Sequence, residues 1–183
     1  MKINDENIFA TRLFIFEFNK DEIYPLIEEV SNKKTKIKNI SKFYSSYTGV
    51  GKHYTDYGNS VRLIEYEKIM LVIGNFFINQ NKFFNLENYW SAIYYENSLH
   101  STHNHSNLIN KREPHNYSCV LYLTDNGGTT FFTSNSTSND CEFYVKSKVG
   151  KLVIFPKSLL HNGVNKEKGE RIIISSNISL YDA

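Results

Sequence analysis

The sequence predicts a mainly β protein, a sandwich or jelly roll with two helices near the N-terminus packed on it. Three observations support this fold class. Short apolar stretches alternate with turn signals after about residue 88, as in all-β domains. Aromatic residues make up 15% of the chain, with 13 Tyr and 13 Phe, and such side chains suit the faces of sheets. Two earlier segments instead space their apolar residues as helices do.

Length and charge limit the possible classes of protein. The 183 residues fit one domain, which we expect to comprise a support region at 1–87 and a core at 88–183 that carries the site. Hydrophobic residues at 40% and charged residues at 22% are typical of soluble globular proteins. The formal net charge is only +2, and the longest basic run, NKKTKIK, is short. This pattern disfavours a nucleic-acid partner.

We expect a cytoplasmic protein without a membrane partner. Acidic residues precede the apolar part of MKINDENIFATRLFIFEF, and no small-residue cleavage site follows it. Apolar runs stay well below the ~18 residues that a membrane span needs. The two cysteines, Cys119 and Cys141, form neither a disulfide framework nor a zinc-finger spacing. Cys119 lies in an alternating apolar run, so we expect it to be buried.

The first third of the chain predicts a strand and a helix. The apolar, aromatic segment 8–18 reads IFATRLFIFEF and favours a strand. Helical spacing of apolar residues follows at 19–34, with Asn19 as the N-cap. Because proline is tolerated only in the first turn of a helix, Pro25 indicates that the helix proper begins near Tyr24.

A loop, a second helix and a series of strands come next. Residues 41–60 are rich in Ser, Gly, Tyr and Thr and predict a loop, in which His53 would be solvated. Residues 61–81 carry one apolar stripe and predict a helix. The turn signal DNGG follows the second of the later strands, and a polar loop occupies 134–140. These strands are expected at 88–97, 117–124, 129–134, 141–147, 150–156 and 171–180.

The segment HSTHNHSN, residues 100–107, holds three of the six histidines. His103 and His105 are two positions apart, so an extended backbone would place them on one face, about 6.5–7 Å apart along the strand. That spacing suits two ligands of one metal ion, and imidazole binds iron, zinc, copper and nickel. The alternative interpretation is a solvated pair.

His161 and Arg171 are the candidates that complete a site. His161 ends the run GKLVIFPKSLLH, and in a jelly roll that strand can lie beside the one carrying the H-x-H pair. Arg171 opens the otherwise apolar strand RIIISSNISL. A guanidinium is costly to bury unless an anion pairs with it. The alternative is a strand-end arginine that reaches solvent.

Together these four residues resemble the 2-oxoglutarate/iron(II)-dependent oxygenase superfamily. Its pattern is H-x-D/E, a distal His, and an Arg or Lys about ten residues later. SCVLYLTDNGGTTFF and GKLVIFPKSLLHNGVNKEKGERIIISSNISL are similar to the superfamily's segments around the distal His. IFATRLF, and Trp90 thirteen residues before His103, are similar to a small, largely uncharacterised group within it. The match is strong over residues 88–180 and looser before them.

The resemblance implies a fold and a chemistry. The fold would be a double-stranded β-helix, that is, a cupin-like jelly roll. Iron(II) would bind to His103, His105 and His161, and Arg171 would pair with the distal carboxylate of 2-oxoglutarate. With O2 as the second co-substrate, the protein would oxidise, by hydroxylation, a carbon of an unidentified primary substrate. Three further residues are candidate polar partners of the co-substrate: Tyr95, Tyr122 and Asn177.

The sequence departs from the superfamily at one ligand. His105 occupies the carboxylate position, and no Asp or Glu lies between Glu96 and Glu113. Imidazole is a good ligand at this spacing, so we favour a three-histidine site. Alternatively, His105 lies outside the coordination shell and leaves a position open, as in oxygenases that halogenate carbon. The third interpretation is that the metal has been lost.

Other assignments stay open at the level of sequence. His100 is expected on a cleft wall or the surface, and His115 in solvent. The segments 41–60, 106–116 and 134–140 would frame the cleft, and none identifies the substrate. Two rival functions remain. One is a cupin-like three-histidine metalloenzyme without 2-oxoglutarate, such as a thiol dioxygenase or a zinc enzyme. The other is a non-catalytic jelly-roll binding module.

Overall fold

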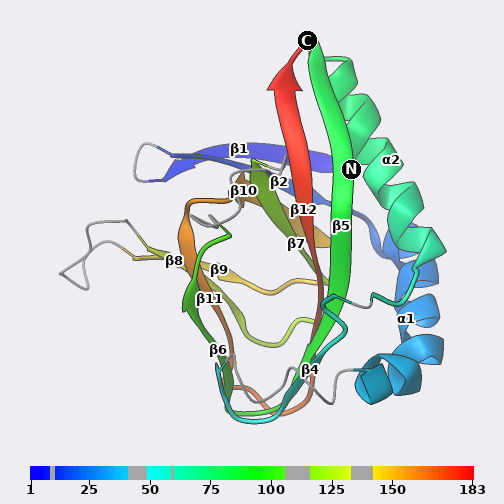
Figure 1. Ribbon diagram of the computed structural model, residues 1–183, viewed down its shortest axis with the longest axis vertical. Helices are drawn as coiled ribbons and strands as arrows, with labels where there is room; N and C mark the ends of the chain where they lie inside the picture. The colour runs from blue at the N-terminus through cyan, green and yellow to red at the C-terminus, as the bar shows by residue number, and fades with distance from the viewer. Residues whose placement is uncertain (9–10, 41–48, 59, 106–115, 133–141) are drawn as a thin grey trace.

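Two antiparallel sheets and two helices make up the described part of the chain (Figure 1). The computed structural model describes residues 1–8, 11–40, 49–58, 60–105, 116–132 and 142–183. The larger sheet has the order β1 (Lys2–Ile8), β2 (Thr11–Glu17), β10 (Lys151–Pro156), β7 (Tyr117–Tyr122), β12 (Arg171–Asp182), β5 (Lys82–Tyr94), β4 (His53–Thr55). The smaller sheet has the order β3 (Gly49–Val50), β6 (Ser98–His103), β11 (Leu160–Asn165), β8 (Gly128–Phe132), β9 (Glu142–Lys146). The predicted mainly β class is confirmed.

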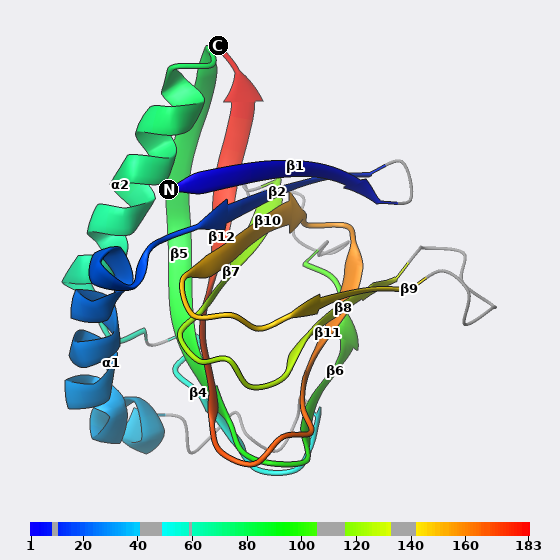
Figure 2. The same ribbon diagram turned by 180° about the vertical axis from the view of Figure 1, so that it is seen from behind.

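Both helices, α1 (Lys20–Ile40) and α2 (Ile64–Ile78), cover the outer face of the larger sheet (Figures 1 and 2). Alternate residues of β2 show the two layers. Phe14 and Phe16 pack with the helices, whereas Leu13 and Ile15 belong to the core between the two sheets. Because both faces of this strand are covered, its sequence is continuously apolar rather than alternating. The predicted packing of the helices on the β core is confirmed.

The strand predictions differ from the structure where a strand carries few apolar residues. β6 and β11 were not predicted as strands, because polar side chains occupy positions that line the candidate site. The prediction of a loop over 41–60 was wrong for β3 and β4, which lie inside it; 41–48 and 59 lie outside the described residues. The N-terminal strand was predicted at 8–18, whereas β1 and β2 form a pair over 2–8 and 11–17. The polar loop 134–140 also lies outside the described residues.

Helix α1 begins at Lys20, so the predicted start near Tyr24 was wrong and Pro25 lies inside the helix. The cap at Asn19 explains the earlier start. Its carbonyl accepts the N–H of Ile23 at 3.2 Å, and its own N–H donates to the Glu22 carboxylate at 2.7 Å. Such reciprocal bonds stabilise a first turn. Proline then removes one bond in the second turn, and a helix of 21 residues tolerates that loss.

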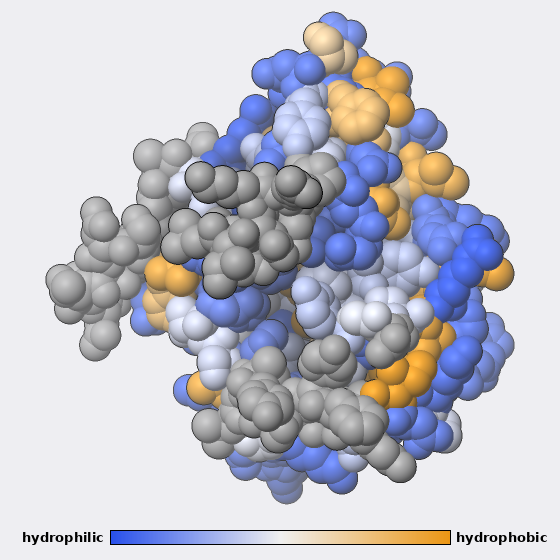
Figure 3. Space-filling model, in the orientation of Figure 1, coloured by the Kyte–Doolittle hydropathy of each residue, from blue (hydrophilic) through white to orange (hydrophobic). Residues whose placement is uncertain are grey.

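The carboxylate of Glu29 on α1 caps the start of α2. Its two oxygens accept the backbone N–H groups of Ile64 and Glu65, each at 2.9 Å. This contact fixes the two helices relative to each other at one end. The outer side of α2 exposes the apolar side chains of Leu71, Val72 and Ile78, with Phe83 beyond its end. Orange, apolar surface lies along this side of the molecule in Figure 3. Within the described ranges, neither helix is long and apolar enough to cross a membrane.

Candidate metal centre

Three histidines come together, one from each of the neighbouring strands β6 and β11 and one from the segment after β6. His103 ends β6, and its partner in the β6–β11 ladder is His161. Their ring centroids lie 4.4 Å apart, and the His105 ring is 5.2 Å from His103 and 5.1 Å from His161. One nitrogen from each ring lies within 4.8 Å of the other two. The sequence predicted this cluster from the H-x-H spacing of His103 and His105 together with the resemblance that added His161.

His105 reaches the cluster from just beyond the end of β6, rather than from a regular strand. Its backbone N–H donates to the carbonyl of Lys157 at 2.8 Å, which holds the segment near the β10–β11 connection. The Nε2 atoms of His105 and His103 are 3.3 Å apart. Two nitrogens bound to one metal at about 2.0–2.1 Å would be separated by about 2.9–3.4 Å. The observed separation therefore fits a shared ion.

Hydrogen bonds to carbonyl oxygens fix the tautomers of two of the rings. The Nδ1 of His103 is 2.8 Å from the Ser101 oxygen, and the Nδ1 of His161 is 2.9 Å from the Leu159 oxygen. Because a carbonyl oxygen only accepts, each Nδ1 carries a hydrogen and each Nε2 keeps its lone pair. Burial lowers the pKa of His103, and burial with the charges of His103 and His105 lowers the pKa of His161 well below 6.5. Both imidazoles are thus neutral, as metal binding requires.

Arg171 lies on another wall of the same pocket and is only 1% exposed. Its guanidinium donates to Thr129 Oγ1 at 3.0 Å and to Ser147 Oγ at 3.4 Å, and it lies 4.9 Å from the centroid of the Tyr94 ring. Among the described residues, no carboxylate pairs with it, and its Nη1 has no hydrogen-bond partner. A buried guanidinium with an N–H left over can bind an anion. The alternative of a solvent-exposed arginine is excluded.

Two glycines make room for this arginine. A Cβ at Gly163 would lie 2.8 Å from Arg171 Nη1, and one at Gly127 would lie 2.9 Å from Arg171 Cδ. Gly127 also has a φ of +70°, which side chains rarely adopt. These positions explain the first glycine of DNGG and the glycine two residues after His161. The sequence indicated a turn at DNGG and a resemblance over both segments, but no contact of either glycine with Arg171 was predicted.

Two further histidines line or back the pocket. His100 packs against His103 with ring centroids 4.3 Å apart, and its Nδ1 is 3.2 Å from the Tyr94 hydroxyl, so its expected place on a cleft wall fits the structure. His53 was expected in solvent, but this was wrong. It is 2% exposed and stacks on Tyr94 at 5.6 Å, because β4 pairs with the end of β5. His115 lies outside the described residues, as does Cys141. Cys119 is buried, as predicted.

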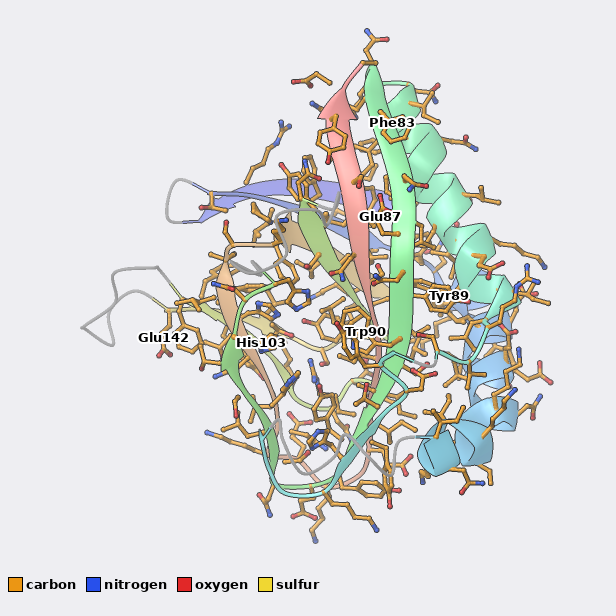
Figure 4. The ribbon with its side chains drawn as sticks, in the orientation of Figure 1. Phe83, Glu87, Tyr89, Trp90, His103 and Glu142 are labelled. Carbon is orange, nitrogen blue, oxygen red and sulfur yellow. The ribbon has the colours of Figure 1, made fainter. Side chains whose placement is uncertain are left out.

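Trp90 on β5 and His103 on β6 stand on opposite sides of the space between the sheets (Figure 4). The indole ring lies 5.9 Å from the ring of His105. Apolar side chains fill much of the remaining wall: Val120, Phe155 and Ile173. The cavity between these walls has a volume of about 30 Å³ and is partly open to solvent.

The structure separates the three candidate partners of the co-substrate. Tyr95 was placed wrongly, because neighbouring strand residues face opposite ways and its hydroxyl accepts a hydrogen bond from Lys38 on α1 at 2.5 Å. Tyr94 lines the pocket in its place. Tyr122 is buried beside Arg171, 5.6 Å from ring centroid to Cζ, and donates to Thr129 at 2.8 Å. Asn177 contacts His105, not Arg171.

Sequence reasoning missed the polar residues that hold these groups in place. Thr129 and Ser147 bind the guanidinium, and Ser118 lies 2.9 Å from the Nδ1 of His105. All three lie at buried positions on or next to otherwise apolar strands. A hydroxyl at an inward-facing strand position was the available signal, since buried polar groups need a partner.

Comparison with known proteins identifies the fold. No protein-family model matches the sequence, and no curated protein matches it. Solved structures do match. A Pseudomonas putida prolyl-4-hydroxylase has a TM-score of 0.68 at 16% identity, with 91% of each chain covered. The viral collagen prolyl hydroxylase of Paramecium bursaria Chlorella virus-1, solved as a 2-oxoglutarate complex, has a TM-score of 0.62 at 17% identity, with 91% of this chain and 94% of that one covered.

A third match was solved with a metal ion and 2-oxoglutarate bound. HygX from Streptomyces hygroscopicus, solved with nickel and 2-oxoglutarate bound, has a TM-score of 0.60 at 12% identity, covering 92% of this chain and 83% of that one. The resemblance to the 2-oxoglutarate/iron(II) oxygenases is therefore confirmed at the level of the fold, across nearly the whole chain.

Proposed function

We propose that this protein is a non-haem iron(II), 2-oxoglutarate-dependent oxygenase, acting as a hydroxylase. One observation carries the proposal: a buried arginine without a carboxylate partner among the described residues shares a pocket with three converging imidazoles. The imidazoles suit a transition metal, and the guanidinium suits a carboxylate. A 2-keto acid that binds the metal at one end and carries a distal carboxylate at the other would contact both the metal and the guanidinium. The fold of the matched oxygenases supports the same proposal.

His103, His105 and His161 would hold the metal. The donor set is all nitrogen, the two tautomers fixed by carbonyl oxygens present Nε2 to the centre, and the 3.3 Å separation fits one ion. The described pocket lining contains no Asp or Glu. The site would thus add no negative charge to the ion, and the ion would keep its affinity for an anionic co-substrate.

Arg171 would hold the distal carboxylate of 2-oxoglutarate, and Tyr122 and Thr129 would keep the guanidinium in place. A bidentate or charge-assisted bond of this kind contributes about 1.5–3 kcal/mol. When bound, iron(II) and 2-oxoglutarate supply the oxidation of a substrate C–H bond by O2, with succinate and CO2 as co-products. The chain's own residues orient the co-substrate between Arg171 and the histidines. Phe155 and Ile173 exclude water from it.

We further propose that the two sheets form a jelly roll of the double-stranded β-helix type, in one domain. Residues 88–183 would form the core, and 1–87 would supply the helices that support the larger sheet. Two of the matched structures are prolyl hydroxylases, so a prolyl residue in a peptide is the first substrate class to test.

A second function is favoured by the donor set itself. Three histidines without a carboxylate also suit a cupin-like metalloenzyme that does not use 2-oxoglutarate, such as a thiol dioxygenase or a zinc enzyme. Arg171 separates the two functions. The 2-oxoglutarate enzyme needs its guanidinium, whereas in the alternative the substitution Arg171→Ala leaves activity unchanged. A non-catalytic binding module would bind no stoichiometric metal.

The test is turnover of the co-substrate. Metal-free protein is loaded with iron(II) without oxygen and then given 2-oxoglutarate, ascorbate and O2, and succinate and CO2 are measured. We expect iron-dependent succinate release that His161→Ala abolishes and that Arg171→Ala lowers when 2-oxoglutarate is limiting. Absence of both succinate release and anaerobic iron binding would overturn the proposal.

A further inference from the structure

A chain of polar side chains reaches His105 from two strands of the larger sheet. The carbonyl oxygen Oδ1 of Asn177 on β12 lies 2.9 Å from His105 Nδ1. Ser118 on β7 lies at the same distance from that nitrogen, and its hydroxyl donates to Asn177 Oδ1 at 3.2 Å. Asn177 and Ser118 are direct partners in the β7–β12 ladder. The contact to the imidazole is therefore built on adjacent strands rather than on a loop.

The orientation of the Asn177 amide is set from its other side. Its Nδ2 donates to Oδ1 of Asn88 at 3.0 Å, and Asn88 is its partner across β5 and β12. The ladder shifts register directly after Asn177. With Asn177 5% exposed and Ser118 1% exposed, both groups depend on these bonds rather than on water. An amide that gives its nitrogen to Asn88 presents its oxygen to His105.

An oxygen that accepts from Nδ1 selects one tautomer of His105. The hydrogen then lies on Nδ1, and Nε2, which faces His103 Nε2 at 3.3 Å, keeps its lone pair. His103 and His161 reach the same tautomer through backbone carbonyls. His105 lies beyond the end of its strand, and among the described residues its Nδ1 contacts side chains instead.

We propose that Asn177, oriented by Asn88 and assisted by Ser118, is a positioning residue that holds His105 in the tautomer able to bind a metal through Nε2. This rests on the three-histidine metal site of the proposed function. A carboxylate can bind a metal through either oxygen, whereas an imidazole must have its lone pair on the nitrogen that faces the metal. The contact from Asn177 therefore explains how His105 can be a ligand at a position where a carboxylate is expected. Loss of such an outer partner typically lowers metal affinity about 10–100-fold.

The first test needs no metal. Long-range ¹H–¹⁵N spectra of the metal-free protein report which nitrogen of each imidazole carries the hydrogen. We expect His105 to be the Nδ1–H tautomer in the wild type, and to shift toward Nε2–H in Asn177→Leu. An Nε2–H tautomer in the wild type would mean that the amide turns its NH2 group toward the ring, and would overturn the proposal. An unchanged spectrum of His105 in Asn177→Leu would also overturn it.

The second test is cobalt(II) titration of the metal-free full-length protein, followed by absorbance. We expect Asn177→Leu to lower the affinity about 10–100-fold and Asn177→Asp, which keeps the acceptor oxygen, to restore it. A second variant, Asn88→Leu, removes the group that orients Asn177, and Asn85→Leu is its matched control. Both asparagines are exposed on β5, but Asn85 bonds Glu87 and not the site. We expect Asn88→Leu alone to weaken binding.

The outcomes separate this proposal from the proposed function. Equal cobalt(II) affinity in wild type, Asn177→Leu and Asn85→Leu would overturn the role of Asn177 while leaving the three-histidine site in place. A wild-type protein that binds no cobalt(II) would overturn the metal site itself, and with it the role of Asn177. Wild-type binding with weak binding in Asn177→Leu supports the proposal, whether or not 2-oxoglutarate is turned over.

Discussion

His103 and His161 are direct partners in the β6–β11 ladder, with ring centroids 4.4 Å apart, although 58 positions separate them in the sequence. The ladder itself sets their distance, so the pair persists whether or not an ion is bound. Because the strands hold the two rings in place, substitution of one residue of the site should change metal or co-substrate binding without rearranging the others.

Substitution of His161 should remove the metal while keeping the fold. His161→Ala deletes one of three neutral donors, and we expect cobalt(II) affinity to fall by more than the roughly 100-fold typical of outer partners. Isothermal titration of the metal-free protein measures this fall. Asn85→Leu serves as the control with wild-type affinity. Wild-type affinity in His161→Ala would show that the ion binds elsewhere.

Arg171 should act on the co-substrate and not on the metal. Arg171→Leu removes the buried cation and its charge-assisted bond, so we expect the KM for 2-oxoglutarate to rise about 10–100-fold. Cobalt(II) affinity should stay within about twofold of wild type. Circular dichroism establishes that the variant is folded. A 2-oxoglutarate KM equal to that of the wild type would contradict the assignment of Arg171 to the co-substrate.

Gly163 provides a matched probe of the same group. A Cβ there would lie 2.8 Å from Arg171 Nη1, at the end of a flexible side chain, so Gly163→Ala should displace the guanidinium without unfolding the protein. We expect weaker 2-oxoglutarate binding and unchanged cobalt(II) binding. The control is Gly74→Ala. A Cβ at Gly74 would lie 2.9 Å from the Phe84 ring, and Arg171 is not among the atoms nearest to it. Equal effects of both variants on 2-oxoglutarate would contradict the prediction.

The metal-free protein should lose stability in acid. Burial, followed by the charge of His103, lowers the pKa of His100 from 6.5 to about 3. Between these values the unfolded state binds a proton at this residue and the folded state does not, so the free energy of unfolding falls as pH falls. The slope is up to about 1.4 kcal/mol per pH unit for each such group. Urea unfolding at pH 7 and pH 5 measures it, and His100→Asn should make the dependence shallower. An identical dependence in the variant would rule this out.

Asp56 should matter for stability alone. It is fully buried, and its two oxygens accept the backbone N–H groups of Val61 at 2.7 Å and Ser91 at 2.6 Å, which ties the entry to α2 to strand β5. Asp56→Asn turns one acceptor into a donor that faces an N–H, so we expect a loss of about 1–3 kcal/mol in the free energy of unfolding. Asp182→Asn, in an exposed ion pair, should change it by under about 0.5 kcal/mol. Urea unfolding distinguishes the two, and similar small effects in both would show that Asp56 is not structural.

The success and failure of the sequence predictions follow the chemistry of each segment. The apolar strands β2, β7, β10 and β12 were predicted because covered faces leave continuous or alternating apolar runs. The strands β6 and β11 were not, because residues that serve the candidate site interrupt that pattern. Likewise Pro25 indicated a later helix start because proline has no backbone N–H to donate. The helix nevertheless begins at Lys20, since the hydrogen bond from the Ile23 N–H to the Asn19 carbonyl stabilises the first turn.

The sequence by itself predicted the class of fold, because hydrophobic periodicity is a local property of the chain. The H-x-H spacing and the resemblance to the oxygenase superfamily singled out four candidate residues: His103, His105, His161 and Arg171. Only the tertiary structure decided what surrounds them. It buried Arg171 without a carboxylate partner among the described residues, turned Tyr94 rather than Tyr95 into the pocket, and brought Asn177 and Ser118 to His105. These facts depend on which strands become neighbours and in which register, and pairing across long sequence separations leaves no periodic signal in the sequence itself.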